Sequence, residues 1–231
     1  MPSAAPDIEF LKQYDTPTIW NALVGLRGHG TAGMTRGRPV VTHPQAAAMV
    51  GYAMTARLIS SAPSEQSVEA QLALRHAYYR YLGAGPRPGI VVIEDCGAEP
   101  GVGSFWGEVN SAIHRGFGLS GVITTGAVRD LDALDPTLPI LAGTVCLGNG
   151  FAHLTEIDVP VEVFGMQVKP GDLLHADRHG AMVIPPEHIE ALPAAIAALM
   201  ERERQVIAST REPGFNAEAM IRAWQFMGAK H

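Results

Sequence analysis

The chain has 231 residues, of which 47% are hydrophobic and 17% charged, with a formal net charge of −6. This composition predicts a compact globular body and excludes a disordered chain. The net negative charge and the absence of any Lys/Arg-rich run argue against nucleic acid or an anionic membrane as a partner.

The N-terminal sequence lacks the features of a secretory signal, since "MPSAAPDIEFLKQYD" has neither a basic start nor an apolar core. No run of about 18 apolar residues predicts a membrane span. The two cysteines have no C-x-x-C spacing and are too few for a disulfide scaffold. We therefore expect a cytoplasmic protein with no membrane or nucleic-acid partner.

The first third of the chain predicts a short tail, two helices and a long strand. Residues 1–14 are expected to form the tail, and residues 16–28 a helix with Thr16 as its N-cap. The run "MVGYAMTARLI" has the length and apolar content of a buried strand. A second helix is expected around residues 64–82.

A strand, a glycine-rich loop, a helix and another strand follow from residue 90. They read "GIVVIEDCG", "AEPGVGSFWG", "EVNSAIHRGFG" and "LSGVITTG". This order predicts neighbouring parallel strands joined by a crossover helix.

The remaining chain predicts short strands and then helices. Strands are expected at "LPILAG", "DVPVEVFGMQV" and "LLHADRHGAMVIP", and residues 186–231 form a helical region that Pro193 kinks or interrupts. Neither an internal repeat nor a linker divides the chain. The pattern predicts one mixed α/β domain.

Four residues at the predicted sheet edge carry the most specific chemical signal. Gly107 and Glu108 stand where the helix begins, and the first N–H groups of a helix favour an anion. Arg129 and Asp130 follow the next strand, at the edge where α/β sheets bind ligands. A guanidinium suits a carboxylate and an aspartate suits Mg²⁺ or Mn²⁺, so the pair could bind a 2-oxo acid on a metal. The alternatives are a mutual ion pair and a glutamate that only compensates the helix dipole.

The stretches "WGEVNSAIHRGFGLSGVITTGAVRD", "LPILAG" and "PGDLLHADRHGAMVIP" resemble the RraA-like family, from about residue 16 to residue 186. The most specific part is a glycine-led acidic motif, twenty intervening residues and Arg-Asp. The resemblance implies an α/β fold of the swivelling-domain type, a three-layer β/β/α sandwich. It also implies a single domain over residues 1–231 with C-terminal helices.

The family includes metal-dependent 4-hydroxy-4-methyl-2-oxoglutarate aldolases and the regulator of ribonuclease activity A. The resemblance implies a lyase that uses Mg²⁺ or Mn²⁺ to cleave a 4-hydroxy-2-oxo acid to pyruvate, with oxaloacetate decarboxylase activity. The alternative is a non-catalytic regulator that binds a ribonuclease. The family also implies a homotrimer or homohexamer with active sites between subunits. No lysine lies in the crevice segment, which favours metal over imine chemistry.

Roles for individual residues also follow from the resemblance. The substrate carboxylate is expected to contact backbone amides of Gly107, Glu108, Val109 and Asn110. Arg129 holds pyruvate, and Asp130 is the direct protein ligand of the metal. Glu108, where family aldolases commonly have aspartate, is linked to the metal through water. Glu201 or Glu203 from a neighbouring subunit completes the metal site through water.

Other polar residues are expected to lie outside the site. His175 and His179 lie in a strand and turn, where exposure or hydrogen bonding is expected instead of metal binding. Cys96 is expected to be a buried, inert thiol and His114 an incidental helix residue. Thr125 is expected to serve strand packing, and the alternative is a hydroxyl that bonds substrate or backbone.

Two further groups of charged residues have alternative interpretations. Glu94 and Asp95 predict either a second carboxylate pair or strand-end side chains that bond a turn. Substrate specificity beyond C4 is expected from loops and a neighbouring subunit. Arg36 and Arg38 either meet a distal carboxylate there or are solvated.

Overall fold

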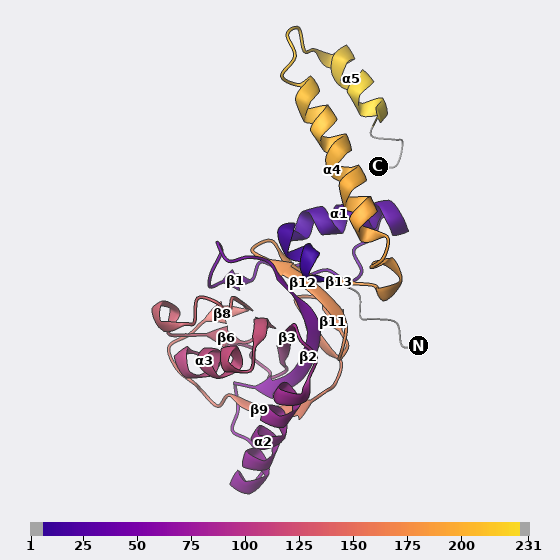
Figure 1. Cartoon of the computed structure of the whole chain (residues 1–231). Helices are drawn as coiled ribbons and strands as arrows, with labels where there is room; N and C mark the ends of the chain where they lie inside the picture. Colours follow the sequence, from indigo (N-terminus) through magenta and orange to yellow (C-terminus); the bar gives the residue numbers. More distant parts are fainter. Residues whose placement is uncertain (1–6, 227–231) are drawn as a thin grey trace, which may run out of the picture.

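A curled eight-stranded mixed sheet forms the centre of the computed structural model, which describes residues 7–226 (Figure 1). Its strands are β1 (Val40–Val41), β2 (Met49–Ile59), β3 (Gly89–Asp95), β5 (Leu119–Thr124), β7 (Ile140–Ala142), β9 (His153–Ile157), β12 (Leu173–Asp177) and β13 (Gly180–Ile184). The order is β1-β7-β5-β3-β2-β12-β13, and β9 also pairs with β2. Strands β2, β3, β5 and β7 are parallel, whereas the other pairings are antiparallel.

Two smaller sheets flank the central one. Strands β10 (Val161–Val163) and β11 (Met166–Val168) form a hairpin, and β4 (Ser104–Trp106), β6 (Ala127–Val128) and β8 (Thr144–Val145) form a parallel sheet. The interpretation of residues 98–107 as only a glycine-rich loop was therefore wrong. Its three-residue strand is too short to show a period of two in the sequence.

The helices lie around the sheet and beyond its end. They are α1 (Thr16–Arg27), α2 (Val68–Ala84), α3 (Glu108–Gly116), α4 (Leu192–Ser209) and α5 (Ala217–Phe226). Helix α3 connects β3 to β5, and these two strands pair in parallel, as the sequence predicts.

Three helix ends differ from the prediction. Asp15, and not Thr16, is the N-cap of α1, because its carboxylate accepts the Thr18 N–H at 2.9 Å. Helix α2 begins at Val68, after the Ser67 cap. Pro193 does not kink a helix: it lies in the first turn of α4, where a missing N–H costs no hydrogen bond.

The two faces of the central sheet bury different side chains of the same strand. On β3, Val91 and Ile93 pack in the cluster that contains residues of α2 and β4, whereas Ile90 and Val92 pack with the β10–β11 hairpin. This alternation is the period of two expected when both faces of a strand are covered. Helix α3 and the three-stranded sheet are thus held on the opposite side from β10–β11.

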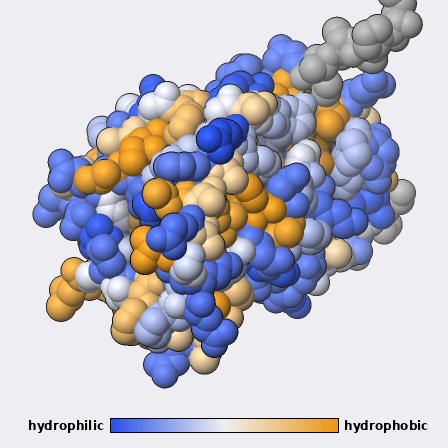
Figure 2. Space-filling model, turned by 90° about the horizontal axis from the view of Figure 1, so that it is seen from below, coloured by the Kyte–Doolittle hydropathy of each residue, from blue (hydrophilic) through white to orange (hydrophobic). Residues whose placement is uncertain are grey.

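A third cluster joins α1 and α4 to the end of the sheet. Ile19, Leu23, Leu192 and Ile196 pack there on β12 and β13. Leu11, within the predicted tail, is fully buried in this cluster, and residues 1–6 lie outside the described residues. Helices α4 and α5 project from the body as an arm (Figure 1). The view from below shows separate hydrophobic areas among hydrophilic side chains (Figure 2).

Arg87 joins the C-terminal ends of the two helices on one side of the sheet. Its guanidinium donates hydrogen bonds to the carbonyl oxygens of Leu82 at 2.6 Å, Gly85 at 2.9 Å and Phe117 at 2.9 Å. The last carbonyls of a helix lack intrahelical partners and attract a cation. One side chain therefore satisfies the ends of α2 and α3 together.

We expect Arg87→Lys to lower the melting temperature by several degrees, because an ammonium cannot reach three divergent carbonyls. A loss of about 1–2 kcal/mol is expected for charge-assisted hydrogen bonds at an exposed residue. Thermal unfolding followed by circular dichroism measures the change. Arg80→Lys, an exposed residue of α2, is the matched control. Equal melting temperatures of both variants and the wild type would contradict the assigned role.

Candidate active site

The start of α3 and the end of the β5–β6 segment meet at Gly107. A Cβ atom at this position would lie 2.5 Å from Asp130 Oδ2 and 3.1 Å from Arg129 Cζ. Only glycine permits so close an approach of the helix start to these two side chains. The predicted convergence of Gly107, Arg129 and Asp130 at one edge of the sheet is therefore present in the fold.

Asp130 links the two segments through its carboxylate. Its Oδ2 atom accepts the Glu108 N–H at 3.2 Å and lies 3.5 Å from Arg129 Nε. The residue adopts left-handed backbone angles of φ 55° and ψ 42°, which aspartate tolerates better than most residues. This turn directs the carboxylate back to the helix. The mutual Arg–Asp ion pair, which the sequence left as the alternative to a substrate and metal site, is present in the structure.

Arg129 is held by the three-stranded sheet. Its Nη1 donates to the Ser104 carbonyl oxygen at 2.8 Å, and its backbone N–H donates to the Trp106 carbonyl oxygen at 2.9 Å. The side chain is 25% exposed. Because a guanidinium has five N–H donors and these contacts involve only Nη1 and Nε, it retains donors for an anion.

The first turn of α3 faces solvent beside this pair. Glu108 and Val109 are exposed, and the Asn110 side-chain amide donates a hydrogen bond to the Phe105 carbonyl oxygen. The first N–H groups of a helix have no intrahelical acceptor, so the amides near Val109 and Asn110 suit a carboxylate. The Glu108 amide is instead directed to Asp130.

The oxygen donors at this edge fit a hard divalent cation. Asp130 has a side chain that is 41% exposed, and the Glu108 carboxylate belongs to the adjoining helix turn. Within the described part of the chain, no group of three or more His, Cys, Asp or Glu side chains could hold a metal. Mg²⁺ usually keeps several waters and binds one or two carboxylates together with substrate oxygens. The small donor set therefore suits Mg²⁺ or Mn²⁺ better than zinc.

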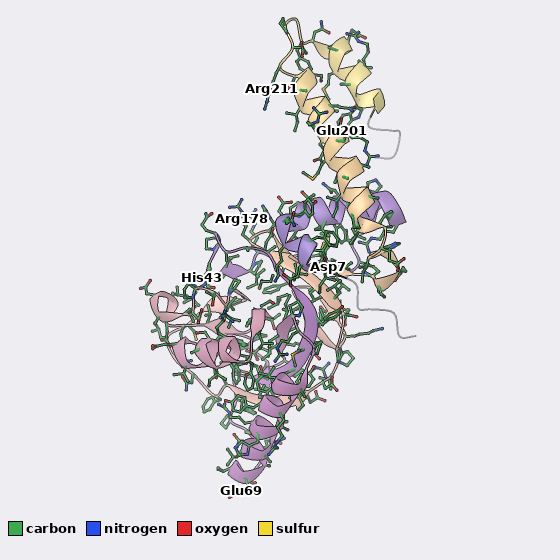
Figure 3. All side chains as sticks on the ribbon, in the orientation of Figure 1. Asp7, His43, Glu69, Arg178, Glu201 and Arg211 are labelled. Carbon is green, nitrogen blue, oxygen red and sulfur yellow. The ribbon has the colours of Figure 1, made fainter. Side chains whose placement is uncertain are left out.

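Glu201 and Glu203 lie on α4, in the projecting arm, away from α3 in the same protomer (Figure 3). Glu201 accepts hydrogen bonds from Arg204 at 2.7 Å and Gln205 at 2.8 Å, and these lower the pKa of its carboxyl to about 2. Glu203 lines a hollow of about 920 Å³ between α1 and α4. Neither glutamate meets the Gly107–Asp130 contact within one protomer.

A family model described as RraA-like, Aldolase/RraA, matches residues 16–183. The chain belongs to the RraA-like family. The matching region contains both halves of the Gly107–Asp130 contact and ends before α4.

Curated relatives of the chain include an aldolase. A 4-hydroxy-4-methyl-2-oxoglutarate aldolase of Thermus thermophilus is 39% identical over 75 residues, which cover 29% of this chain and 43% of the relative. The matched segments span half or less of the length of the curated relatives.

Solved structures match over most of the chain. An uncharacterized protein from Pseudomonas syringae pv. tomato has a TM-score of 0.70 at 20% identity, covering 94% of this chain and 96% of that one. Streptomyces coelicolor RraAS2, described as an unusual member of the RNase ES inhibitor RraA protein family, has a TM-score of 0.64 at 20% identity. It covers 91% of this chain and 100% of its own. These likenesses support the RraA-like fold.

Asp95, for which the sequence analysis left two interpretations, organises the sheet edge. Its buried carboxylate accepts hydrogen bonds from Ser60 Oγ at 2.5 Å, Gly101 N–H at 2.7 Å and Gly97 N–H at 3.2 Å. Its own N–H donates to Thr125 Oγ1 at 2.9 Å, so the alternative in which the Thr125 hydroxyl bonds backbone is present. The turn-bonding alternative is correct for Asp95, and it fixes the loop that leads into β4.

His114 is a buried anchor of α3, and its interpretation as incidental was wrong. Its Nδ1 contacts the Asn110 carbonyl oxygen at 2.6 Å, and its Nε2 contacts the phenolic oxygen Oη of Tyr78 at 2.7 Å. Because a carbonyl only accepts, Nδ1 carries the proton and Nε2 accepts from the phenol. Burial lowers the pKa of His114 to about 4. Its partner on α2 lies 36 residues away in the sequence, which no local pattern reveals.

Three other expectations are resolved by the structure. Cys96 is exposed, so the prediction of a buried thiol was wrong, although its thiol bonds the Leu58 carbonyl oxygen. His175 is fully buried and hydrogen-bonded, whereas His179 is exposed and contacts Asp177. Arg36 donates to the Gly165 carbonyl oxygen in the β10–β11 turn, on the sheet face opposite to α3.

The buried imidazole predicts that stability falls in mild acid. His114 has a folded-state pKa below its usual value of 6.5, so the unfolded chain binds more protons between about pH 6.5 and pH 4. Its contribution is retained above pH 6.5 and is reduced by about 2 kcal/mol at pH 5. Urea unfolding at pH 7 and pH 5 measures this loss, which should be smaller in His114→Gln. His76→Gln, an exposed residue of α2, is the control. An equal pH dependence in all three proteins would refute the assignment.

Proposed function

We propose that the protein is a divalent-metal-dependent lyase that cleaves a 4-hydroxy-2-oxo acid to pyruvate, with oxaloacetate decarboxylation as a second activity. The observation that carries the proposal is the contact of Gly107 with Arg129 and Asp130 at the start of α3. This contact brings an anion-binding guanidinium and a hard carboxylate ligand to one exposed edge. The RraA-like family membership and the aldolase of Thermus thermophilus agree with this chemistry.

Each part of the site has a role in this reaction. Arg129 and the first amides of α3 bind the carboxylate of the 2-oxo acid. Asp130, together with Glu108 through water, would hold Mg²⁺ or Mn²⁺. When bound, such an ion supplies Lewis-acid polarisation of the oxo group. The Arg129 guanidinium stabilises the negative charge that develops on the pyruvate fragment.

The bond changes in the aldol cleavage require a base. The 4-hydroxyl proton leaves to a water oriented by Glu108, the C3–C4 bond breaks, and its electron pair passes into the pyruvate enolate. Protonation of C3 then gives pyruvate, and C4 leaves as the carbonyl carbon of the second product. Oxaloacetate decarboxylation breaks the corresponding bond and releases carbon dioxide without a hydroxyl proton transfer.

The assembly forms part of this proposal. A homotrimer or homohexamer would place the α4 arm of one subunit at the site of its neighbour. Glu203 is better suited than Glu201 to complete the metal site, because Glu201 is paired with Arg204 and Gln205. We also propose that the fold is a three-layer β/β/α sandwich, in which β10–β11 and the helices lie on opposite faces of the central sheet.

A regulator that binds a ribonuclease is the competing function, because RraAS2 is described with an RNase inhibitor family. Binding of a protein does not require a guanidinium and a carboxylate held beside a buried glycine at a helix start. Binding of a substrate carboxylate and a metal does require such groups, and both remain accessible to solvent, so the ion pair favours catalysis. Stable ribonuclease binding without any metal-dependent turnover would favour the regulator.

The test is pyruvate release from 4-hydroxy-4-methyl-2-oxoglutarate and from oxaloacetate, followed with lactate dehydrogenase, with Mg²⁺, Mn²⁺ or a chelator. We expect the chelator to abolish turnover, and Asp130→Ala to lower it at least about a hundredfold. Calorimetric titration with Mn²⁺ should show the same loss of binding. Asp132→Ala, which removes a nearby exposed carboxylate, is the matched control. Turnover that survives both the chelator and Asp130→Ala would refute the proposal.

Glu108→Gln tests the proton path separately from metal binding. Loss of a general base typically lowers the rate by about 10²–10⁴-fold, so we expect kcat to fall with little change in KM. Glu99→Gln, in the exposed loop before β4, controls for the loss of one negative charge. Full turnover of Glu108→Gln on a 4-hydroxy-2-oxo acid would remove Glu108 from the mechanism. Decarboxylation of oxaloacetate should be less affected, because it releases no hydroxyl proton.

A further inference from the structure

Ser111 is a buried polar residue of α3 that the site described above does not use. Its side chain is inaccessible to solvent, at 0% exposure. The Oγ atom donates a hydrogen bond to the Glu108 carbonyl oxygen at 2.8 Å and accepts the Asp135 N–H at 3.2 Å. This hydroxyl therefore joins the first turn of α3 to the segment that follows Asp130.

The segment after Asp130 is short and held at both ends. The Ala133 N–H donates to the Asp130 carbonyl oxygen at 2.8 Å, which closes the single turn at residues 131–133. Leu134 is buried in the same core cluster as Trp106. Asp135 follows directly. The hydrogen bond from the Asp135 N–H to Ser111 therefore helps to fix the backbone that carries Asp130.

Hydrogen bonds form a closed ring through the two carboxylate residues of the site. Asp130 Oδ2 accepts the Glu108 N–H at 3.2 Å. The Glu108 carbonyl oxygen accepts from Ser111, and Ser111 accepts from Asp135, from which the chain leads back to Asp130. The N–H and the C=O of Glu108 are thus both tied to residues 130–135. All of these groups belong to one protomer, and Ser111 is inaccessible from its surface.

A second contact joins the same two elements without involving Glu108. Arg115 lies four residues after Ser111, on the same face of α3, and its Nε donates to Thr137 Oγ1 at 2.6 Å. Thr137 Oγ1 donates in turn to Asp135 Oδ1 at 2.6 Å. The Thr137 hydroxyl therefore also makes two hydrogen bonds at this boundary, and its removal is a matched comparison for the removal of the Ser111 hydroxyl.

Helix formation does not explain a serine at position 111. Serine is a weaker helix former than alanine, because its hydroxyl competes for backbone groups, and α3 has only nine residues. A hydroxyl that bonds a carbonyl of the preceding turn also tends to bend a helix. The Ser111 hydroxyl is therefore unfavourable for α3 alone, and its contact with Asp135 is what it adds to the fold.

We infer that Ser111 is a positioning residue that sets the place of the Glu108 carboxylate relative to Asp130. The inference rests on the proposed function, in which Glu108 orients the water that takes the 4-hydroxyl proton. Because the Glu108 N–H and C=O are both held, the direction in which its side chain leaves the backbone is fixed. Loss of the Ser111 hydroxyl frees the carbonyl side, so the water is less well placed. Ser111 itself touches neither substrate nor metal.

The test measures aldol cleavage of 4-hydroxy-4-methyl-2-oxoglutarate and decarboxylation of oxaloacetate by the same variants. Ser111→Ala should lower kcat for the aldol cleavage about ten- to a hundredfold with little change in KM, as expected for a displaced catalytic group. Decarboxylation should fall less, because it has no hydroxyl proton transfer. The ratio of the two activities therefore shifts in the same direction as in Glu108→Gln.

Two variants separate this role from a loss of stability. Thr137→Val removes the matched hydroxyl and should leave the ratio of activities unchanged. Ser111→Thr keeps a hydroxyl that can bond the preceding turn and should restore the aldol activity. Ser111→Cys, a weak donor of similar size, takes the place of alanine if Ser111→Ala does not fold. A ratio that moves equally in Ser111→Ala and Thr137→Val would overturn the inference.

A double-mutant cycle shows whether Ser111 acts through Glu108. In the Glu108→Gln background, Ser111→Ala should lower kcat by no more than about twofold, because the carboxylate that it positions is already gone. The same large loss in both backgrounds would mean that Ser111 acts elsewhere, and would overturn the inference while leaving the proposed lyase in place.

Hydrogen exchange followed by mass spectrometry tests the geometry without any turnover. Ser111→Ala should speed exchange in peptides that cover residues 105–112 and residues 131–137, whereas Thr137→Val should speed it only in the second. Unchanged exchange of residues 105–112 in Ser111→Ala would overturn the inference. If the wild type releases no pyruvate from either substrate with any metal, the proposed function fails, and the role of Ser111 in catalysis fails with it.

Discussion

The close approach of Gly107 to Arg129 and Asp130 is the constraint on which the candidate site depends. It requires a residue without a side chain at the helix start, a left-handed turn at Asp130, and a guanidinium held by a carbonyl of β4. These conditions are met by segments about twenty residues apart in the sequence. The parallel β3–α3–β5 connection brings them together, because it returns the chain to the same edge of the sheet.

Buried polar contacts keep this edge in place from behind. Asp95 fixes the loop into β4, and β4 supplies the Ser104 carbonyl that binds Arg129. His114 and Tyr78 fix α3 to α2, while Arg87 satisfies the carbonyl ends of both helices. Because an unpaired buried polar group is costly, these networks define one arrangement of the helix start. The exposed residues of the site are therefore attached to a backbone that is held in one position.

The sequence predicted those features that local patterns determine. The β2 strand, the crossover unit and the Arg129–Asp130 pair follow from apolar runs, glycine breaks and motif spacing. It did not predict β4, β6 and β8, since strands of two or three residues carry no periodicity. It also missed the Tyr78–His114 contact, because the partners come from different helices. Asp15 replaced Thr16 as a cap, since aspartate and threonine are both common there and the Thr16 hydroxyl bonds His175.

The backbone hydrogen bond of Glu108 explains how a glutamate fits at the start of α3. Its N–H is bound to Asp130 Oδ2, so the start of the side chain is fixed beside the aspartate while the carboxylate extends into solvent. A longer side chain lets two like charges separate, and repulsion between carboxylates decreases with distance. The positive ends of the first α3 amides and the Arg129 guanidinium offset the charge that remains. An edge with one guanidinium and two carboxylates can therefore bind a substrate carboxylate and a divalent ion together.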